Sequence, residues 1–126
     1  MRLIQFPNES KSKWIDKYNE LMLRSEMHDF EGQKLTLHHI IPRSIDPSLK
    51  DVRENWAFLP FKEHMDAHYY LWKYDKNYAS QLWFGCVYGR KHNLWNLPGG
   101  EAEYSELKRD VREYRKRKEK EAKICE

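Results

Sequence analysis

The chain begins with hydrophobic residues at helical spacing. Residues 10–27 hold apolar side chains three or four positions apart, which predicts an amphipathic helix with one buried face. These apolar positions are Trp14, Tyr18, Leu21 and Met22. Asn8 or Ser10 is expected to cap this helix, because short polar side chains accept hydrogen bonds from the free N–H groups of a first turn.

The pattern then changes to two short strands and a second helix. Residues 34–40 are rich in β-forming side chains and predict a first strand. A polar loop with two prolines occupies residues 42–54, and residues 55–60 predict a second strand that ends in a proline. Helical spacing returns over residues 61–74.

The last part of the chain is helical with one interruption. Residues 78–88 predict another helix, and residues 89–100 form an irregular connector that ends in a Pro-Gly-Gly turn. A final helix is expected from about Glu101, with a narrow apolar stripe and a basic run near its end. The elements together predict an α+β fold, in which two short strands are accompanied by several helices.

The size and the charge of the chain exclude few classes of function. The 126 residues suit a single domain, and 34% of them are charged with a formal net charge of +3. This mildly basic balance is compatible with a polyanionic partner but is shared by many proteins that bind no nucleic acid.

The cysteines and the apolar segments indicate where the protein works. Cys86 and Cys125 are far apart and form no Cys-x-x-Cys pair, so free thiols in a reducing cytosol are the simplest interpretation. The N-terminus is too short and polar for a signal peptide, and no apolar run approaches the ~20 residues that cross a bilayer. We therefore expect a soluble, cytoplasmic protein.

Histidines carry the strongest functional signal. Four of the six fall into two pairs within one short stretch, His38-His39 and His64-x-x-x-His68. The second pair has the spacing that places two imidazoles on one face of a helix. The first pair precedes a proline, where a bend can direct the two side chains to different tasks.

These residues suit phosphodiester hydrolysis, which needs a nucleophile generated near neutral pH and positive charge on the phosphate. With His38, His64 and His68 as metal ligands, His39 stays free to take the proton of an attacking water. Asn55 can support that base, either through its side-chain amide or by bracing the loop. Imidazole suits Zn, Ni, Co or Fe, whereas Mg prefers oxygen ligands. We expect one divalent ion, with Mg, Mn, Ni and Zn all open.

The order of these residues resembles a known nuclease motif. Residues 37–68 read Leu-His-His-Ile-Ile-Pro-Arg-Ser, then Asn55, then Glu-His-x-x-Ala-His, and look like the HNH endonuclease motif, also called ββα-metal or His-Me finger. The match is to the form frequent in phage and mobile-element (homing-like) proteins. The resemblance implies two antiparallel strands and a helix around one metal ion at about residues 35–75, with nicking or double-strand cleavage of DNA that leaves 5′-phosphate and 3′-hydroxyl ends.

Carried over by position, the resemblance assigns a role to each residue of the motif. It implies that His38 and His64 are metal ligands, that His39 is the general base and that Asn55 braces the second strand. His68 matches an additional histidine found in nuclease bacteriocins, where it adds to the metal or phosphate site. Residues 1–100 then form the HNH domain with its N-terminal helix, and residues 101–126 a basic helix that is part of this domain or appended to it.

Two departures from the family pattern affect these expectations. Many members have Asp in place of His38, so the histidine favours softer transition ions. The Cys-x-x-Cys zinc pairs that flank many HNH motifs are absent, so aromatic packing is expected to hold the motif together. The expected core aromatics are Trp56, Phe58, Trp72 and Trp83.

DNA is the expected partner, with no membrane and no small-molecule substrate, and homodimerisation stays open. Arg43 can reach a phosphate with its planar guanidinium and assist catalysis, or it is a solvated loop residue. Further basic candidates for phosphate contacts are Arg90, Lys91, Arg115, Lys116, Arg117 and Lys118, and the alternative for the last four is a solvated helix face. Two other functions remain: a metal-stapled DNA-binding module without turnover, and a toxin nuclease held by an acidic immunity partner.

Overall fold

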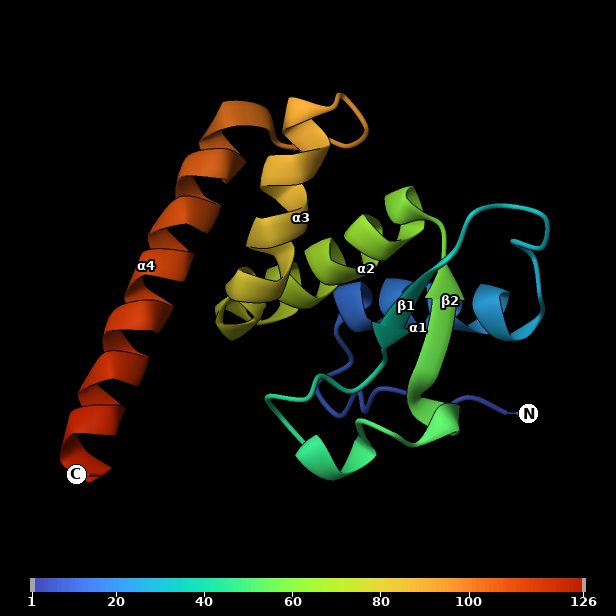
Figure 1. Ribbon diagram of the computed structural model, residues 1–126, viewed down its shortest axis with the longest axis horizontal. Helices are drawn as coiled ribbons and strands as arrows, with labels where there is room; N and C mark the ends of the chain where they lie inside the picture. Colours follow the sequence, from blue (N-terminus) through green and yellow to red (C-terminus); the bar gives the residue numbers. More distant parts are fainter. Residues whose placement is uncertain (1, 126) are drawn as a thin grey trace.

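The structure is a computed structural model that describes residues 2–125, with side chains up to residue 122. It is an α+β fold with a ββα core and additional helices, as the sequence predicts (Figure 1). The helices are α1 (Lys13–Glu26), α2 (Phe61–Tyr74), α3 (Ala79–Lys91) and α4 (Gly100–Cys125). The strands are β1 (Thr36–His39) and β2 (Trp56–Leu59), and the short 3₁₀ turns are η1 (Pro47–Leu49), η2 (Arg53–Asn55) and η3 (Lys76–Tyr78).

Helix α1 begins later than the sequence indicates. Its N-cap is Ser12, whose hydroxyl accepts a hydrogen bond from the backbone N–H of Trp14 at 3.1 Å. The prediction that Asn8 or Ser10 caps the helix is therefore wrong. The side chain of Asn8 instead accepts from the N–H of Ser12, so it holds the residue that does the capping.

The two strands form an antiparallel hairpin in which Thr36 pairs with Leu59 and His39 with Trp56. Because side chains alternate along a strand, His38 lies on the buried face and His39 on the opposite one. Phe58 is also on the outer face and is 48% exposed, so the expectation that it belongs to the core is wrong. Both strands are shorter than predicted, because the chain leaves the ladder after His39 and enters η2 before Trp56.

Helix α2 lies in the middle of the fold (Figure 1), between two hydrophobic clusters. One side of it packs with α1 and the hairpin, and the other side packs with α3 and α4. The first cluster includes Ile15, Tyr18, Leu21, Ile40, Ala57, Leu59, Ala67 and Leu71. The second includes Met65, Tyr69, Trp72, Leu82, Cys86, Leu107 and Val111. This arrangement fixes both faces of the helix that carries His64 and His68.

Of the four aromatics expected to form the core, Trp72 is buried, while Trp56 and Trp83 are partly exposed. Cys86 is a buried free thiol, and burial raises its pKa. The side chain of Cys125 lies outside the described residues.

Helix α3 runs through residues 89–91, which were expected to be irregular, so the connector is only residues 92–99. Its Gly85 lies so close to α2 that an added Cβ would meet the sulfur of Met65, and this crossing brings α3 near the hairpin end of α2. Helix α4 packs along α3 with its first turns, and its C-terminal part extends away from the other helices (Figure 1).

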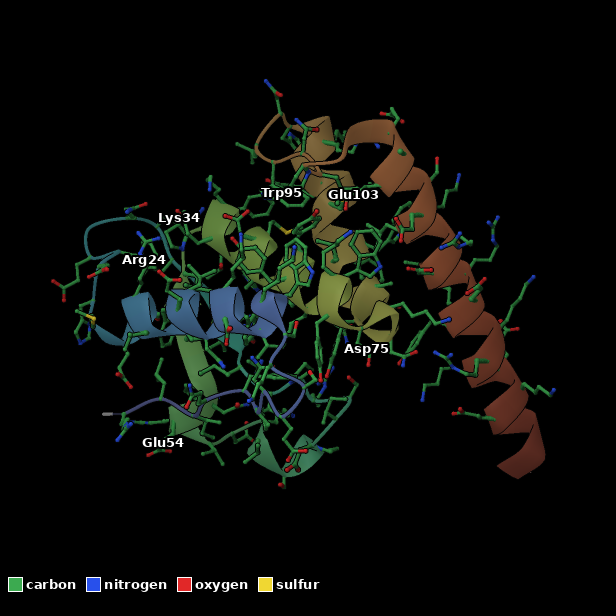
Figure 2. The ribbon with its side chains drawn as sticks, turned by 180° about the vertical axis from the view of Figure 1, so that it is seen from behind. Arg24, Lys34, Glu54, Asp75, Trp95 and Glu103 are labelled. Atoms are coloured by element: carbon green, nitrogen blue, oxygen red, sulfur yellow. The ribbon has the colours of Figure 1, made fainter. Side chains whose placement is uncertain are left out.

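Two acidic residues of α4 anchor it to α2. Glu103, which is labelled on α4 in Figure 2, accepts hydrogen bonds from the hydroxyl of Tyr69 and, at 3.0 Å, from the ammonium of Lys73. Further along, the indole of Trp72 donates to the buried carboxylate of Asp110 at 2.8 Å. Within residues 2–125, no helix combines the length and the apolar character needed to span a membrane.

Candidate metal centre

Three imidazoles meet where the buried face of the hairpin contacts α2. His38 comes from β1, and His64 and His68 come from successive turns of α2. Their ring centroids are 4.8, 4.9 and 5.0 Å apart, and each residue offers one nitrogen within 4.8 Å of the other two. The structure therefore brings together the three histidines that the sequence grouped as ligands.

A hydroxyl from α1 fixes the tautomer of His38. Tyr18 donates its only hydroxyl hydrogen to the carbonyl of Ile40 at 2.7 Å, and its oxygen lies 2.6 Å from Nε2 of His38. Because the hydroxyl hydrogen is already used, Nε2 must carry the imidazole proton and donate it to Tyr18. The lone pair of His38 is therefore on Nδ1. Burial raises the pKa of Tyr18 well above its ordinary value, so the hydroxyl stays neutral in this role.

A hydroxyl group of the hairpin fixes the tautomer of His64 in the same way. Thr36 donates its hydroxyl hydrogen to the carbonyl of Leu59 at 2.8 Å, and its oxygen lies 2.7 Å from Nδ1 of His64. Nδ1 of His64 must therefore be the protonated nitrogen, which leaves the lone pair on Nε2. Tyr18 and Thr36 were not among the sequence-predicted site residues.

The remaining nitrogens indicate that the cluster fits a metal ion. Nδ1 of His38 and Nδ1 of His68 are buried and have no hydrogen-bond partner among the described residues. Burial lowers the pKa of His38 well below its ordinary value and that of His68 to about 3, and it also lowers the pKa of His64. All three imidazoles are thus neutral near pH 7 and carry lone pairs, which is the state that coordinates a metal. Buried imidazole nitrogens without partners are costly unless a ligand uses them.

His39 lies on the other face of β1 and is oriented separately. Its Nε2 is 3.0 Å from the backbone carbonyl of Lys50, which can only accept. Nε2 must therefore hold the proton, and Nδ1 has the free lone pair. The neighbouring histidines thus differ in environment: His38 is buried among imidazoles, and His39 is partly exposed.

Asn55 is fully buried in η2 and braces the loop that follows β1. Its side-chain oxygen accepts from the N–H of Ile41, and its amide donates to the carbonyls of Ile41 and Leu49. Of the two ways in which Asn55 was expected to act, the contacts correspond to bracing the loop. The ring of His39 is hydrogen-bonded to the backbone carbonyl of Lys50 and not to Asn55.

An open cavity of about 560 Å³ connects the histidines. It is lined by His38, His39, His64 and His68, together with polar and basic residues that include Arg43, Ser44, Lys50 and Gln81. None of the described residues that line it is Asp or Glu. A cavity with basic side chains and no carboxylate favours an anionic ligand such as a phosphate.

Comparison of the chain with protein-family models, with curated proteins and with solved structures finds no match. The hairpin, the following helix and the three-histidine cluster are compatible with a ββα-metal motif. This compatibility rests on the geometry of the structure and not on a similar protein.

The other basic residues proposed for DNA contacts lie away from this cavity lining. Arg90 donates to Glu101 at 2.7 Å and stacks on the ring of Tyr104. Lys91 is exposed at the end of α3. The exposed run on α4 consists of Arg115, Lys116, Arg117 and Lys118, of which Arg117 contacts Asn77 and Lys118 pairs with Glu121. Their contact with DNA stays a prediction.

Proposed function

We propose that this protein is a metal-dependent DNA endonuclease of the HNH type that hydrolyses phosphodiester bonds. One observation carries the proposal: an imidazole with a fixed tautomer and a free lone pair shares a carboxylate-free cavity with a three-imidazole donor set. A purely structural metal site has no use for the additional base. The resemblance of residues 37–68 to the HNH motif agrees with this arrangement.

His39 acts as the general base in this proposal. Its Nε2–H is committed to the Lys50 carbonyl, so Nδ1 takes a proton from a water molecule in the cavity. The water oxygen forms a bond to phosphorus, the bond to the 3′ oxygen breaks, and that oxygen takes its proton from solvent. The products are a 5′-phosphate and a 3′-hydroxyl.

The three-histidine cluster would hold the divalent ion, which supplies positive charge for the phosphate oxygens when it is bound. The donors are His38 Nδ1, His64 Nε2 and a nitrogen of His68. Three neutral nitrogens suit Zn, Ni, Co or Fe better than Mg, which prefers oxygen ligands.

Arg43 and Lys50 are the residues best placed to attract the DNA backbone. Both line the cavity, and Arg43 is exposed. A guanidinium can bind two phosphate oxygens at once and so orient the scissile group. This agrees with the expected role of Arg43 in catalysis and DNA binding.

A plasmid-nicking assay with Mg, Mn, Ni, Co and Zn tests the proposal directly. The wild-type chain should convert supercoiled DNA to nicked or linear forms with at least one of these ions, and end analysis should find 5′-phosphates. His39→Ala should lose cleavage by about a hundredfold or more, the usual contribution of a general base. It should still bind metal with wild-type affinity in calorimetry.

His92→Ala is the matched control, because His92 is an exposed histidine at the end of α3 with no proposed role. It should cut at the wild-type rate. Cleavage by His39→Ala at that same rate would refute the mechanism. Silence of the wild type with every ion on single-stranded, duplex and branched DNA would refute the nuclease and favour a metal-stapled binding module.

A further inference from the structure

The backbone carbonyl of Lys50 accepts two side-chain hydrogen bonds. One comes from Nε2 of His39 at 3.0 Å, and the other comes from the indole Nε1 of Trp56 at 2.8 Å. A carbonyl oxygen has two lone pairs, so it can accept both at once. His39 and Trp56 are direct partners in the register of the hairpin, and both therefore lie on its outer face.

Asn55, the residue before Trp56, also holds the loop segment that contains Lys50. The amide of Asn55 donates to the carbonyl of Leu49 at 3.2 Å, and the indole of Trp56 donates to the carbonyl of Lys50. Two consecutive side chains thus hold two consecutive carbonyls of the loop. Asn55 fixes where the segment lies, and Trp56 fixes the direction of the one carbonyl to which His39 donates.

Few other contacts hold this carbonyl in place. Among the described residues, no backbone N–H donates to the Lys50 oxygen, which lies at an exposed point just after η1. Without the indole, a rotation of the peptide plane would take the acceptor away from His39. The imidazole would then be free to turn or to move its proton to Nδ1, the nitrogen that the proposed reaction needs unprotonated.

From this geometry we infer that Trp56 is a positioning residue for the general base, acting on His39 through the Lys50 carbonyl. The inference rests on the proposed function. It goes beyond that function because it assigns to a partly exposed aromatic residue a role that depends on its indole N–H and not on its packing.

Trp56→Phe separates the two roles, since it removes the N–H and keeps an aromatic ring on the same strand. The variant should lose roughly tenfold or more in kcat, because a misplaced catalytic group costs up to about a hundredfold, while KM for DNA changes little. Trp95→Phe is the matched control. It also removes an indole N–H bond, here to Asp66 at 2.9 Å, and should leave kcat unchanged.

A second measurement does not depend on cleavage. In metal-free protein, the ¹⁵N chemical shifts of the imidazoles report which nitrogen carries the proton, with His39→Ala identifying the His39 signals. His39 should be an Nε2–H tautomer in the wild type and in the control variant Trp95→Phe. It should become a mixture of tautomers in Trp56→Phe.

The outcomes separate this inference from the proposed function. A wild-type protein that cuts DNA, together with an unchanged kcat or an unchanged His39 tautomer in Trp56→Phe, overturns the inference and leaves the nuclease standing. A tautomer change of His39 in Trp56→Phe, together with a wild-type protein that cuts no DNA, supports the contact but overturns its catalytic purpose. If Trp56→Phe does not fold, the isostere benzothienylalanine at this position replaces N–H by sulfur in a ring of the same size, with the same expected results.

Discussion

Replacing Tyr18 by phenylalanine removes one oxygen atom from the core and should weaken metal binding without opening a large cavity. The hydroxyl is the acceptor for Nε2 of His38 and the donor to the carbonyl of Ile40. In Tyr18→Phe, both of those groups are left buried without their partner. His38 can then keep an unsatisfied Nε2–H or move its proton to Nδ1, and the second choice blocks the nitrogen that would bind the ion.

The magnitude follows from the two lost hydrogen bonds. Each one contributes about 0.5–1.5 kcal/mol, so the free energy of unfolding should fall by roughly 1–3 kcal/mol. Removing the residue that orients a metal-binding histidine typically costs about 10–100-fold in metal affinity. We therefore expect a weaker Kd for Zn or Ni by that factor, and a smaller rise in Tm when the ion is added.

Tyr78→Phe is the matched control for this experiment. Tyr78 is buried in the same cluster and packs edge-on against Phe6, but its hydroxyl makes no hydrogen bond among the described residues. Calorimetric titration of wild type and both variants, with denaturant unfolding of the metal-free proteins, gives the two numbers needed. Equal metal affinity in all three proteins would show that the hydrogen bond between Tyr18 and His38 does not affect metal binding.

Two further predictions follow from the same site. The metal-free protein should lose stability as pH falls below about 6.5, because burial lowers the pKa of His68 to about 3 and that of His38 well below its ordinary value. The unfolded chain then binds protons first, so His68 alone costs on the order of 2 kcal/mol by about pH 5, and unfolding curves from pH 7 to 5 that coincide would contradict this. Arg43→Gln should weaken DNA binding and reduce the slope of log K against log salt by about 1, and a slope equal to wild type would show that Arg43 contacts no phosphate.

Local patterns predicted the frame of the site well. The helical spacing after Pro60 predicted α2 at residues 61–74, which are its observed bounds. The two strands were also predicted, because β-forming runs flank a proline-containing polar loop, while their antiparallel pairing was implied by the resemblance to the HNH motif. Phe58 was misplaced because β-forming composition was counted without the alternation of faces. With Ala57 and Leu59 buried against α2, a strand must turn Phe58 outward.

The contacts that orient the imidazoles could not be predicted in the same way. Tyr18 occupies an apolar stripe, where an aromatic residue signals packing, and its partner His38 lies 20 residues further along the chain. Thr36 has the sequence character of an ordinary strand residue, and it reaches His64 only because the hairpin lies against α2. Such contacts depend on tertiary packing, which no local pattern encodes.

The three oriented histidines share a feature that explains why their tautomers could not be predicted from the sequence. His38 is anchored through Tyr18 on the carbonyl of Ile40, His64 through Thr36 on the carbonyl of Leu59, and His39 directly on the carbonyl of Lys50. Each tautomer is thus set by a backbone oxygen, and a backbone oxygen has no residue type to recognise. Side-chain substitution at these three carbonyl positions should therefore leave the tautomers unchanged unless it moves the backbone. Substitution of Asn55 or Trp56, which hold the backbone itself, should change them.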